Sequence, residues 1–170
     1  MSIIKVKSRG TDNVTGRRNL MINGAMQIAQ RGTSSTNSGY RTCDRWKHTY
    51  STDQYAATQA QVTDVPTGYG FTKSLRYTVT TPETSLDGAN YVAMTQFIEA
   101  ANLQHLCYGT SSAKTSTLSF WVKSSVTGTY AISIFQQDGN RHIVPTYAIS
   151  SANTWEHKTI QIPGDTGGTI

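Results

Sequence analysis

The sequence predicts an all-β protein built as an antiparallel β-sandwich, and three observations support this prediction. Threonine and serine are abundant, with 26 and 17 copies, so 43 of 170 residues carry a small hydroxyl, whereas charged residues make up only 15 %. Threonine is β-branched and suits a pleated surface. Several segments alternate apolar and polar residues with the two-residue period of a strand. Short turn sequences separate these segments, which favours antiparallel strands over β-α-β units.

The second half of the chain carries the clearest strand signals. Alternation predicts strands over residues 117–123, 129–135, 141–149 and 155–162. In the first of these, Leu118, Phe120 and Val122 fall on one face, and Ser119, Trp121 and Lys123 fall on the other. The sequence Asp138-Gly-Asn140 is a strong turn signal between two of the strands.

The first half predicts further strands at a similar spacing. We expect them over residues 44–50, 54–63, 74–80 and 91–98, with a short helical turn over 99–106. In the third strand, Leu75, Tyr77 and Val79 are expected to point inward. Residues 20–22 and 26–28 alternate on either side of the Asn23-Gly24 turn signal. These two segments predict short strands, because Asn-Gly argues against the alternative of a short helix.

Positive charge is concentrated at the front of the chain. Up to Lys47 there are nine basic residues and two acids, a net charge of +7, whereas the remainder has six basic residues and eight acids, a net charge of −2. Residues 1–18 are polar and rich in turn formers, so we expect an extended arm that docks on a partner. The candidate docking residues are Ile3, Ile4, Lys5, Lys7, Arg9, Arg17 and Arg18. Nucleic acid is the alternative partner, but we rank it low because no stacking pattern or recognised module accompanies the charges; a merely solvated face remains open.

No catalytic, metal-binding or cofactor-binding pattern is present in the sequence. Cys43 and Cys107 lie far apart, without the spacing of a zinc site, and are expected to be free thiols. The four histidines occur singly, and no pair of acids is selected by its spacing. There is no phosphate-binding or dinucleotide-binding motif and no apolar run of membrane-spanning length. We therefore expect a protein that is not an enzyme, has no cofactor or metal, and does not insert into a membrane.

Several motifs, in order along nearly the whole chain, carry a resemblance to a known group of proteins. They are Arg18–Thr33 (RNLMINGAMQIAQRGT), Asp44-Arg45-Trp46, Leu118–Ser124 (LSFWVKS), Thr127–Tyr130 (TGTY), Asn153–Glu156 (NTWE) and Ile162–Asp165 (IPGD). Together they resemble the carbohydrate-binding-like jelly-roll domains of bacteriophage tail-fibre and other virion proteins. The leader SIIKVKSRG also looks like the start of marine phage fibre-type proteins.

The resemblance implies a jelly-roll β-sandwich over residues 19–170 behind the arm over 1–18. It differs from the family in two places. Gln27 stands where many relatives carry a calcium-binding acid, and a neutral amide is a weaker ligand for a hard cation, so no calcium is expected. The chain ends at Ile170, soon after the Pro-Gly-Asp turn, where the family has closing strands. We expect either that the chain is a fragment or that a neighbouring subunit fills the open edge.

The resemblance implies a structural component of a virion, most simply a tail-fibre or tail-appendage protein attached by its arm. Its partners would be other tail, adaptor or capsid proteins and further copies of itself, with assembly in the host bacterial cytoplasm. It could also bind a host-surface glycan, for which Trp121 and Lys123 are the candidate residues, while Trp46 and Trp155 are expected to pack in the sheets. A capsid decoration protein of the same fold and a stand-alone carbohydrate-binding module remain as alternatives.

Overall fold

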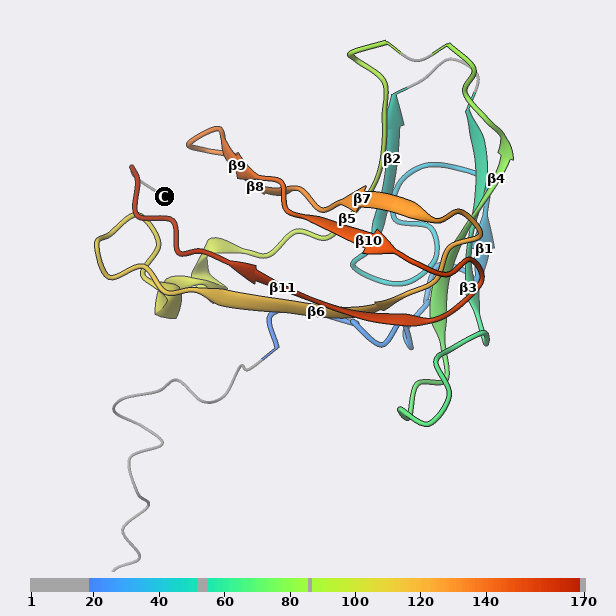
Figure 1. Cartoon of the computed structure of the whole chain (residues 1–170), viewed down its shortest axis with the longest axis horizontal. Coiled ribbons are helices and arrows are strands. Elements are labelled where there is room, and N and C mark those ends of the chain that lie inside the picture. Colours follow the sequence, from blue (N-terminus) through green and yellow to red (C-terminus); the bar gives the residue numbers. More distant parts are fainter. Residues whose placement is uncertain (1–18, 52–54, 86, 169–170) are drawn as a thin grey trace, which may run out of the picture. The chain divides into compact units, whose positions relative to one another are not determined.

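The computed structural model describes residues 19–51, 55–85 and 87–168, so the predicted docking arm and its seven candidate residues lie outside the described residues. The chain divides into two compact units, Met1–Ile98 and Glu99–Ile170. The boundary falls inside the range for which the sequence predicted a single sandwich. Each unit is described below by itself, and Figure 1 labels the strands.

Unit 1 contains two small antiparallel sheets (Figure 1). Its strands are β1 (Ser34–Ser35), β2 (Lys47–Ser51), β3 (Ala56–Val62), β4 (Ser74–Thr81) and β5 (Tyr91–Thr95). The first sheet has the order β1-β3-β4, and the second pairs β2 with β5. An isolated bridge between Gly39 and His48 ties the loop after β1 to β2.

The fully buried residues of unit 1 are mostly polar. Thr42, Cys43, His48, Ala57 and Gln59 are each exposed by 3 % or less. The Thr42 hydroxyl donates to the Gln59 side-chain oxygen at 3.1 Å, and the Gln59 amide nitrogen donates to the Asn37 carbonyl at 2.7 Å. These bonds replace the water that the two side chains lose on burial.

His48 lies inside a group of tyrosines. Its ring centroid is 4.6 Å from that of Tyr77, 5.3 Å from that of Tyr50 and 6.0 Å from that of Tyr55. In the described part of the chain, neither imidazole nitrogen of His48 nor the Tyr77 hydroxyl has a hydrogen-bond partner. Burial lowers the pKa of His48 and raises the pKa of Tyr77.

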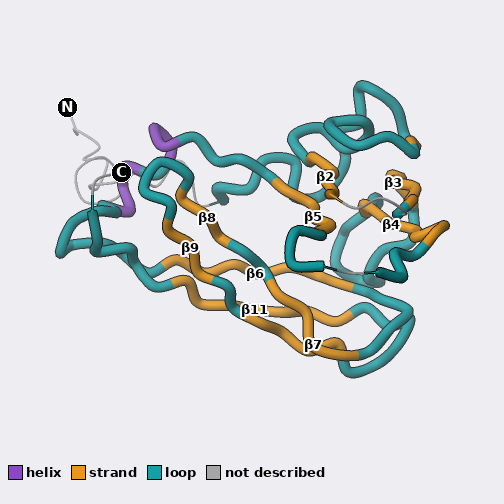
Figure 2. Tube along the Cα trace, turned by 90° about the horizontal axis from the view of Figure 1, so that it is seen from above, coloured by secondary structure: helices purple, strands orange, loops and turns teal. Residues whose placement is uncertain are grey.

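Unit 2 begins with two short 3-10 helices, η1 (Ala100–Asn102) and η2 (Gln104–Leu106). Six strands follow: β6 (Ser116–Val122), β7 (Gly128–Ala131), β8 (Ile134–Gln136), β9 (Arg141–Ile143), β10 (Thr146–Ile149) and β11 (Glu156–Ile162). They form three antiparallel pairs, β6 with β11, β7 with β10, and β8 with β9. Figure 1 labels all six strands, and Figure 2 shows the β6–β11 and β8–β9 pairs from a second direction.

The β6–β11 and β7–β10 pairs pack together through aromatic side chains. The ring centroid of Phe120 on β6 lies 5.1 Å from that of Tyr147 on β10, in an edge-on contact. Tyr147 in turn stacks on Tyr130 of β7, with centroids 5.8 Å apart. Ile149, at the end of β10, is only 2 % exposed. One face of the β6–β11 ribbon is therefore an inner face, covered by β10.

The prediction of an all-β, antiparallel protein is confirmed. Most strands are also where the sequence placed them, and the short helical turns over 99–106 are present. The turn over residues 137–140 joins β8 to β9, with Asn140 at a φ of 47°. Asparagine tolerates this left-handed conformation better than most residues.

Four details of the sequence prediction are wrong. The segments flanking Asn23-Gly24 are not strands, because the Asn23 side chain bonds both the N–H and the carbonyl of Ile28 and turns the chain. The predicted strand over 141–149 is split at Pro145, which has no N–H for a sheet. The predicted strand over 129–135 is split opposite it, at Ile132 and Ser133. Val79 was expected inside but is 54 % exposed.

Candidate functional site

The best candidate for a binding site is the outer face of the β6–β11 ribbon. Residues directly opposite each other in antiparallel strands point to the same side of the sheet. The register pairs Thr117 with Gln161, Ser119 with Thr159, and Trp121 with His157. All of these side chains except that of Trp121 are exposed, and Trp121 is half-buried.

The aromatic residues gather at one end of this face. The rings of Trp121 and His157 contact each other at a centroid distance of 5.2 Å. Lys123 comes two residues after Trp121, and Trp155 comes two residues before His157. The Lys123 Nζ lies over the Trp155 ring, 5.7 Å from its centroid. We call the eight residues of this surface the outer face: Thr117, Ser119, Trp121, Lys123, Trp155, His157, Thr159 and Gln161.

The intervening residues point to the inner face, where Leu118 pairs with Ile160 and Phe120 with Lys158. This explains why the ribbon keeps its orientation, since a slip of one residue would bring Leu118 and Phe120 into water. The only acid of the two strands, Glu156, also alternates to the inner side. Its carboxylate accepts a hydrogen bond from Lys158 Nζ at 2.6 Å and from the backbone N–H groups of Ser150 and Ser151 at 2.9 Å each.

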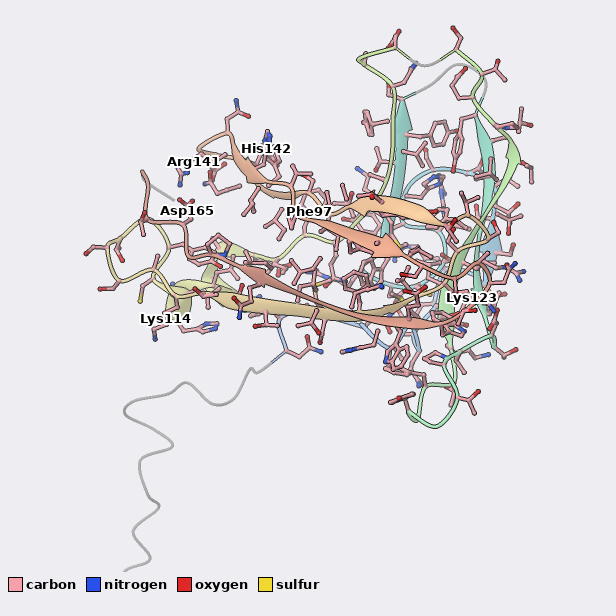
Figure 3. All side chains as sticks on the ribbon, in the orientation of Figure 1. Phe97, Lys114, Lys123, Arg141, His142 and Asp165 are labelled. Atoms are coloured by element: carbon pink, nitrogen blue, oxygen red, sulfur yellow. The ribbon has the colours of Figure 1, made fainter. Side chains whose placement is uncertain are left out.

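These contacts hold Glu156 in its charged form. The hydrogen bond from Lys158, followed by those from the backbone, keeps the pKa of Glu156 below its usual value. A second carboxylate of unit 2 is held in the same way. Asp165 accepts hydrogen bonds from Nε and Nη2 of Arg141, at 3.1 and 2.7 Å (Figure 3). The hydrogen bonding from Arg141 holds the pKa of Asp165 below its usual value.

The outer face combines the two kinds of group that bind sugars. An aromatic ring can pack against the apolar C–H face of a pyranose, while hydroxyl and amide groups bond its hydroxyls. Trp121 and His157 supply the rings, and Thr117, Ser119, Thr159 and Gln161 supply the polar groups. Lys123 adds an ammonium group at the same end of the ribbon, over the Trp155 ring.

The structure brings the two predicted glycan-binding residues, Trp121 and Lys123, to one end of the same face, as the alternation predicted. Sequence reasoning missed their cross-strand neighbours, His157 and Trp155. Trp155 is half-buried, with the Lys123 ammonium over its ring. Trp46 is also half-buried, and its indole N–H donates to the Asn23 carbonyl at 3.2 Å.

The other residues that the sequence singled out do not form a binding site among the described residues. Gln27, at the position of the family's calcium-binding acid, donates to the Thr72 hydroxyl at 3.0 Å. Over the described residues, no group of three or more His, Cys, Asp or Glu side chains is placed to hold a metal ion. Cys43 and Cys107 are free thiols. Within the same part of the chain, no helix has the length and apolar character needed to cross a membrane.

Comparison with protein families, with curated proteins and with solved structures found no match to this chain.

Proposed function

We propose that this protein is a structural component of a bacteriophage virion, of the tail-fibre or tail-appendage type, and that it contributes to recognition of host-surface glycans. In this proposal the strands belong to a sandwich of the jelly-roll type, and residues 1–18 attach the protein to the particle. The virion assignment is supported by the ordered sequence motifs and the basic front end. The glycan assignment is supported by the outer face.

The observation that carries the binding function is the cross-strand pairing of Trp121 with His157, beside two cross-strand pairs of hydroxyl and amide side chains. The same ribbon places its apolar residues on the opposite side, against Tyr147. The rings of Trp121 and His157 therefore lie on the side of the ribbon that faces away from this packing. Grouped rings with flanking polar side chains fit a saccharide better than they fit an apolar partner, which would leave the hydroxyls unsatisfied.

A glycan array with the intact chain tests the binding function. We expect binding to a restricted set of bacterial surface glycans, and we expect Trp121→Ala to weaken it by at least roughly tenfold, since buried aromatic anchors dominate binding energies. Phe135→Ala is the matched control, because Phe135 is an aromatic residue of unit 2 that is 52 % exposed and lies on β8, outside the β6–β11 ribbon. A blank array, or equal loss in both variants, would remove the glycan function.

The virion function has a separate test. Deleting residues 2–18 should abolish incorporation into particles while the remaining chain still folds, and normal incorporation would refute the role of the arm. The copy number per particle then separates the alternatives. A small multiple of the tail symmetry supports a tail appendage, whereas hundreds of copies would indicate a capsid decoration protein instead.

A further inference from the structure

We infer that the free edge of β5 pairs with the β5 strand of a second copy of this chain, so that the two copies share one continuous sheet. This inference goes beyond the proposed function, because it concerns a different surface and needs no ligand. It is drawn from the direction of the backbone groups of β5, from the exposure of its side chains and from its lack of charge.

β5 is the edge strand of a two-stranded sheet. It pairs with β2 along one side, and no other described strand pairs with its second side. An unpaired edge presents N–H and carbonyl groups to any strand that approaches, and proteins usually protect such an edge with a charge, a proline or a bulge. Residues 90–98 contain no charged residue and no proline. β5 also pairs with β2 in one unbroken register over all of its residues.

The hydrogen bonds of His48 show which backbone groups of β5 face the free edge. The N–H and the carbonyl of His48 both bond Gly39, at 3.2 and 2.7 Å, so they point away from β5. Met94 lies directly opposite His48, and opposite residues of an antiparallel pair exchange either both bonds or neither. The N–H and carbonyl of Met94 therefore point to the free edge, and so do those of Val92, two residues earlier.

The side chains along this edge are apolar and exposed. Tyr91 is 50 % exposed, Val92 48 % and Met94 41 %, and Phe97, two residues beyond the strand, is 51 % exposed. Large apolar side chains that gather on one exposed segment mark an interaction surface, whereas single ones need no explanation. The edge therefore offers both backbone bonds and apolar area to a partner strand.

A second copy of β5 fits this edge in an antiparallel register. With Ala93 on the twofold axis, Val92 of each copy lies opposite Met94 of the other, and each of these pairs exchanges both N–H···O bonds. Ala93 meets its own copy as a non-hydrogen-bonded pair, where the strands approach most closely and a small side chain fits. Tyr91 lies opposite Thr95, so every residue of the strand has an uncharged partner.

The lack of charge favours a second copy as the partner. Like charges that lie directly opposite each other destabilise a sheet, so a charged edge is less suited to pair with itself. The other sheet of unit 1 ends on β4, which carries Arg76 and is followed by Pro82. β5 can pair with itself without bringing like charges together, and twofold contacts of this kind are the commonest in homo-oligomers.

Self-association of the intact chain is measured by sedimentation equilibrium over a series of protein concentrations. We compare the unmodified chain with Ala93→Lys, Ala93→Glu and Ala93→Ser, and check each variant for unchanged thermal unfolding. Ala93→Lys and Ala93→Glu each place like charges together on the twofold axis, whereas an equal mixture of the two variants places opposite charges there. Thr80→Lys, at an exposed position of β4, is the matched control for an added charge.

We expect the unmodified chain to form dimers. Ala93→Lys and Ala93→Glu should each raise the dissociation constant by at least roughly fivefold, while Ala93→Ser and Thr80→Lys leave it unchanged. The mixture of the two charged variants should recover the dimer. Recovery in the mixture also shows that both variants are folded, so misfolding does not explain their weaker association.

A cross-link tests the register of the two strands. The Cα atoms of a non-hydrogen-bonded antiparallel pair are about 4.5 Å apart, within the range that a disulfide spans. In a Cys43→Ala/Cys107→Ala background, Ala93→Cys should therefore give a disulfide-linked dimer under mild oxidation. Thr80→Cys in the same background is the control and should stay unlinked.

Three outcomes would overturn the inference. A chain that stays monomeric at every concentration would leave this edge to a strand of a different protein. A dimer that the charged variants do not weaken, or that their mixture does not recover, would place the contact elsewhere on the chain. Equal cross-linking of Ala93→Cys and Thr80→Cys would show random collision in place of a defined register.

Discussion

His48 should make the stability of unit 1 depend on pH in a range where few other groups titrate. Its side chain is 1 % exposed and surrounded by tyrosine rings. Burial raises the pKa of Tyr55 and Tyr77, and burial together with the nearby Asp44 raises the pKa of Cys43 to about 11. These groups are therefore neutral near pH 6 and provide no negative charge for an imidazolium. The folded state consequently favours neutral His48, and its pKa is lowered.

The direction and size of the effect follow from proton linkage. In the unfolded chain His48 takes up a proton near its ordinary pKa of 6.5, whereas the folded chain takes it up only at lower pH. Above pH 6.5 both states are neutral, so stability is at its full value. Below pH 6.5 the unfolded state binds more protons, and the free energy of unfolding falls by up to about 1.4 kcal/mol per pH unit until the folded pKa is reached. Between pH 6.5 and 5 the loss is at most about 1.6 kcal/mol, because the unfolded histidine is already half protonated at pH 6.5.

Urea denaturation at several pH values measures this slope. The chain has three tryptophans, and Trp46 alone lies in unit 1, so a Trp121→Phe/Trp155→Phe background reports on unit 1 through its fluorescence. In that background, His48→Phe should remove the slope between pH 6.5 and 5. The low pKa of Glu156 and Asp165 places their own effects at lower pH, below about 4.5.

The same variant has an expected effect at neutral pH. His48→Phe should be at least as stable as the parent at pH 7.5, since an unsatisfied buried polar group costs about 1–3 kcal/mol. His142→Gln, at an exposed histidine of β9, is the control and should keep the slope. A slope that persists in His48→Phe, or a parent chain without one, would refute the reasoning.

Two further predictions concern packing and thiol reactivity. A Cβ added at Gly164 would lie 2.5 Å from the Ala113 carbonyl oxygen, so Gly164→Ala should cost about 1–3 kcal/mol in urea denaturation; Gly167→Ala, whose nearest neighbour would be 3.7 Å away, should cost far less, and equal costs would contradict this packing. Ellman's reagent at pH 8 should modify Cys107, which is half-buried, well before Cys43, which is 1 % exposed with a pKa of about 11. Simultaneous modification of both thiols would show that Cys43 is accessible without unfolding.

Much of the fold could be predicted because the alternation of apolar and polar residues marks a strand within a short stretch of sequence. Alternation in residues 117–123 gave both the strand and its two faces, and the turn over 137–140 followed from its Asp-Gly-Asn sequence. The errors arose where a side chain bonds or packs against residues that are distant in the sequence. Asn23 bonds the backbone five residues later and also donates to the Asp44 carbonyl, so the alternation around it reflects a tertiary turn. The burial of His48 likewise depends on rings from β2, β4 and the segment between β2 and β3.

The candidate site was half predictable for a similar reason. A single strand shows which residues share a face, so Trp121 and Lys123 could be grouped from sequence. Which residues of β11 stand beside them depends on register, and register is fixed by the whole ribbon. One signal was available: residues 155–162 alternate as residues 117–123 do, and pairing their apolar positions inward would have placed His157 beside Trp121.

The alternation of the β6–β11 ribbon also has an evolutionary consequence. Leu118, Phe120 and Ile160 are constrained by packing, because changes there would open cavities against the neighbouring pair of strands. Thr117, Ser119, Thr159 and Gln161 on the outer face are exposed, and exposed substitutions in a strand usually change stability little. A lineage can therefore exchange these exposed side chains one at a time while the packing of the ribbon stays intact. Along each strand of the ribbon, positions that packing constrains alternate with positions that can diversify.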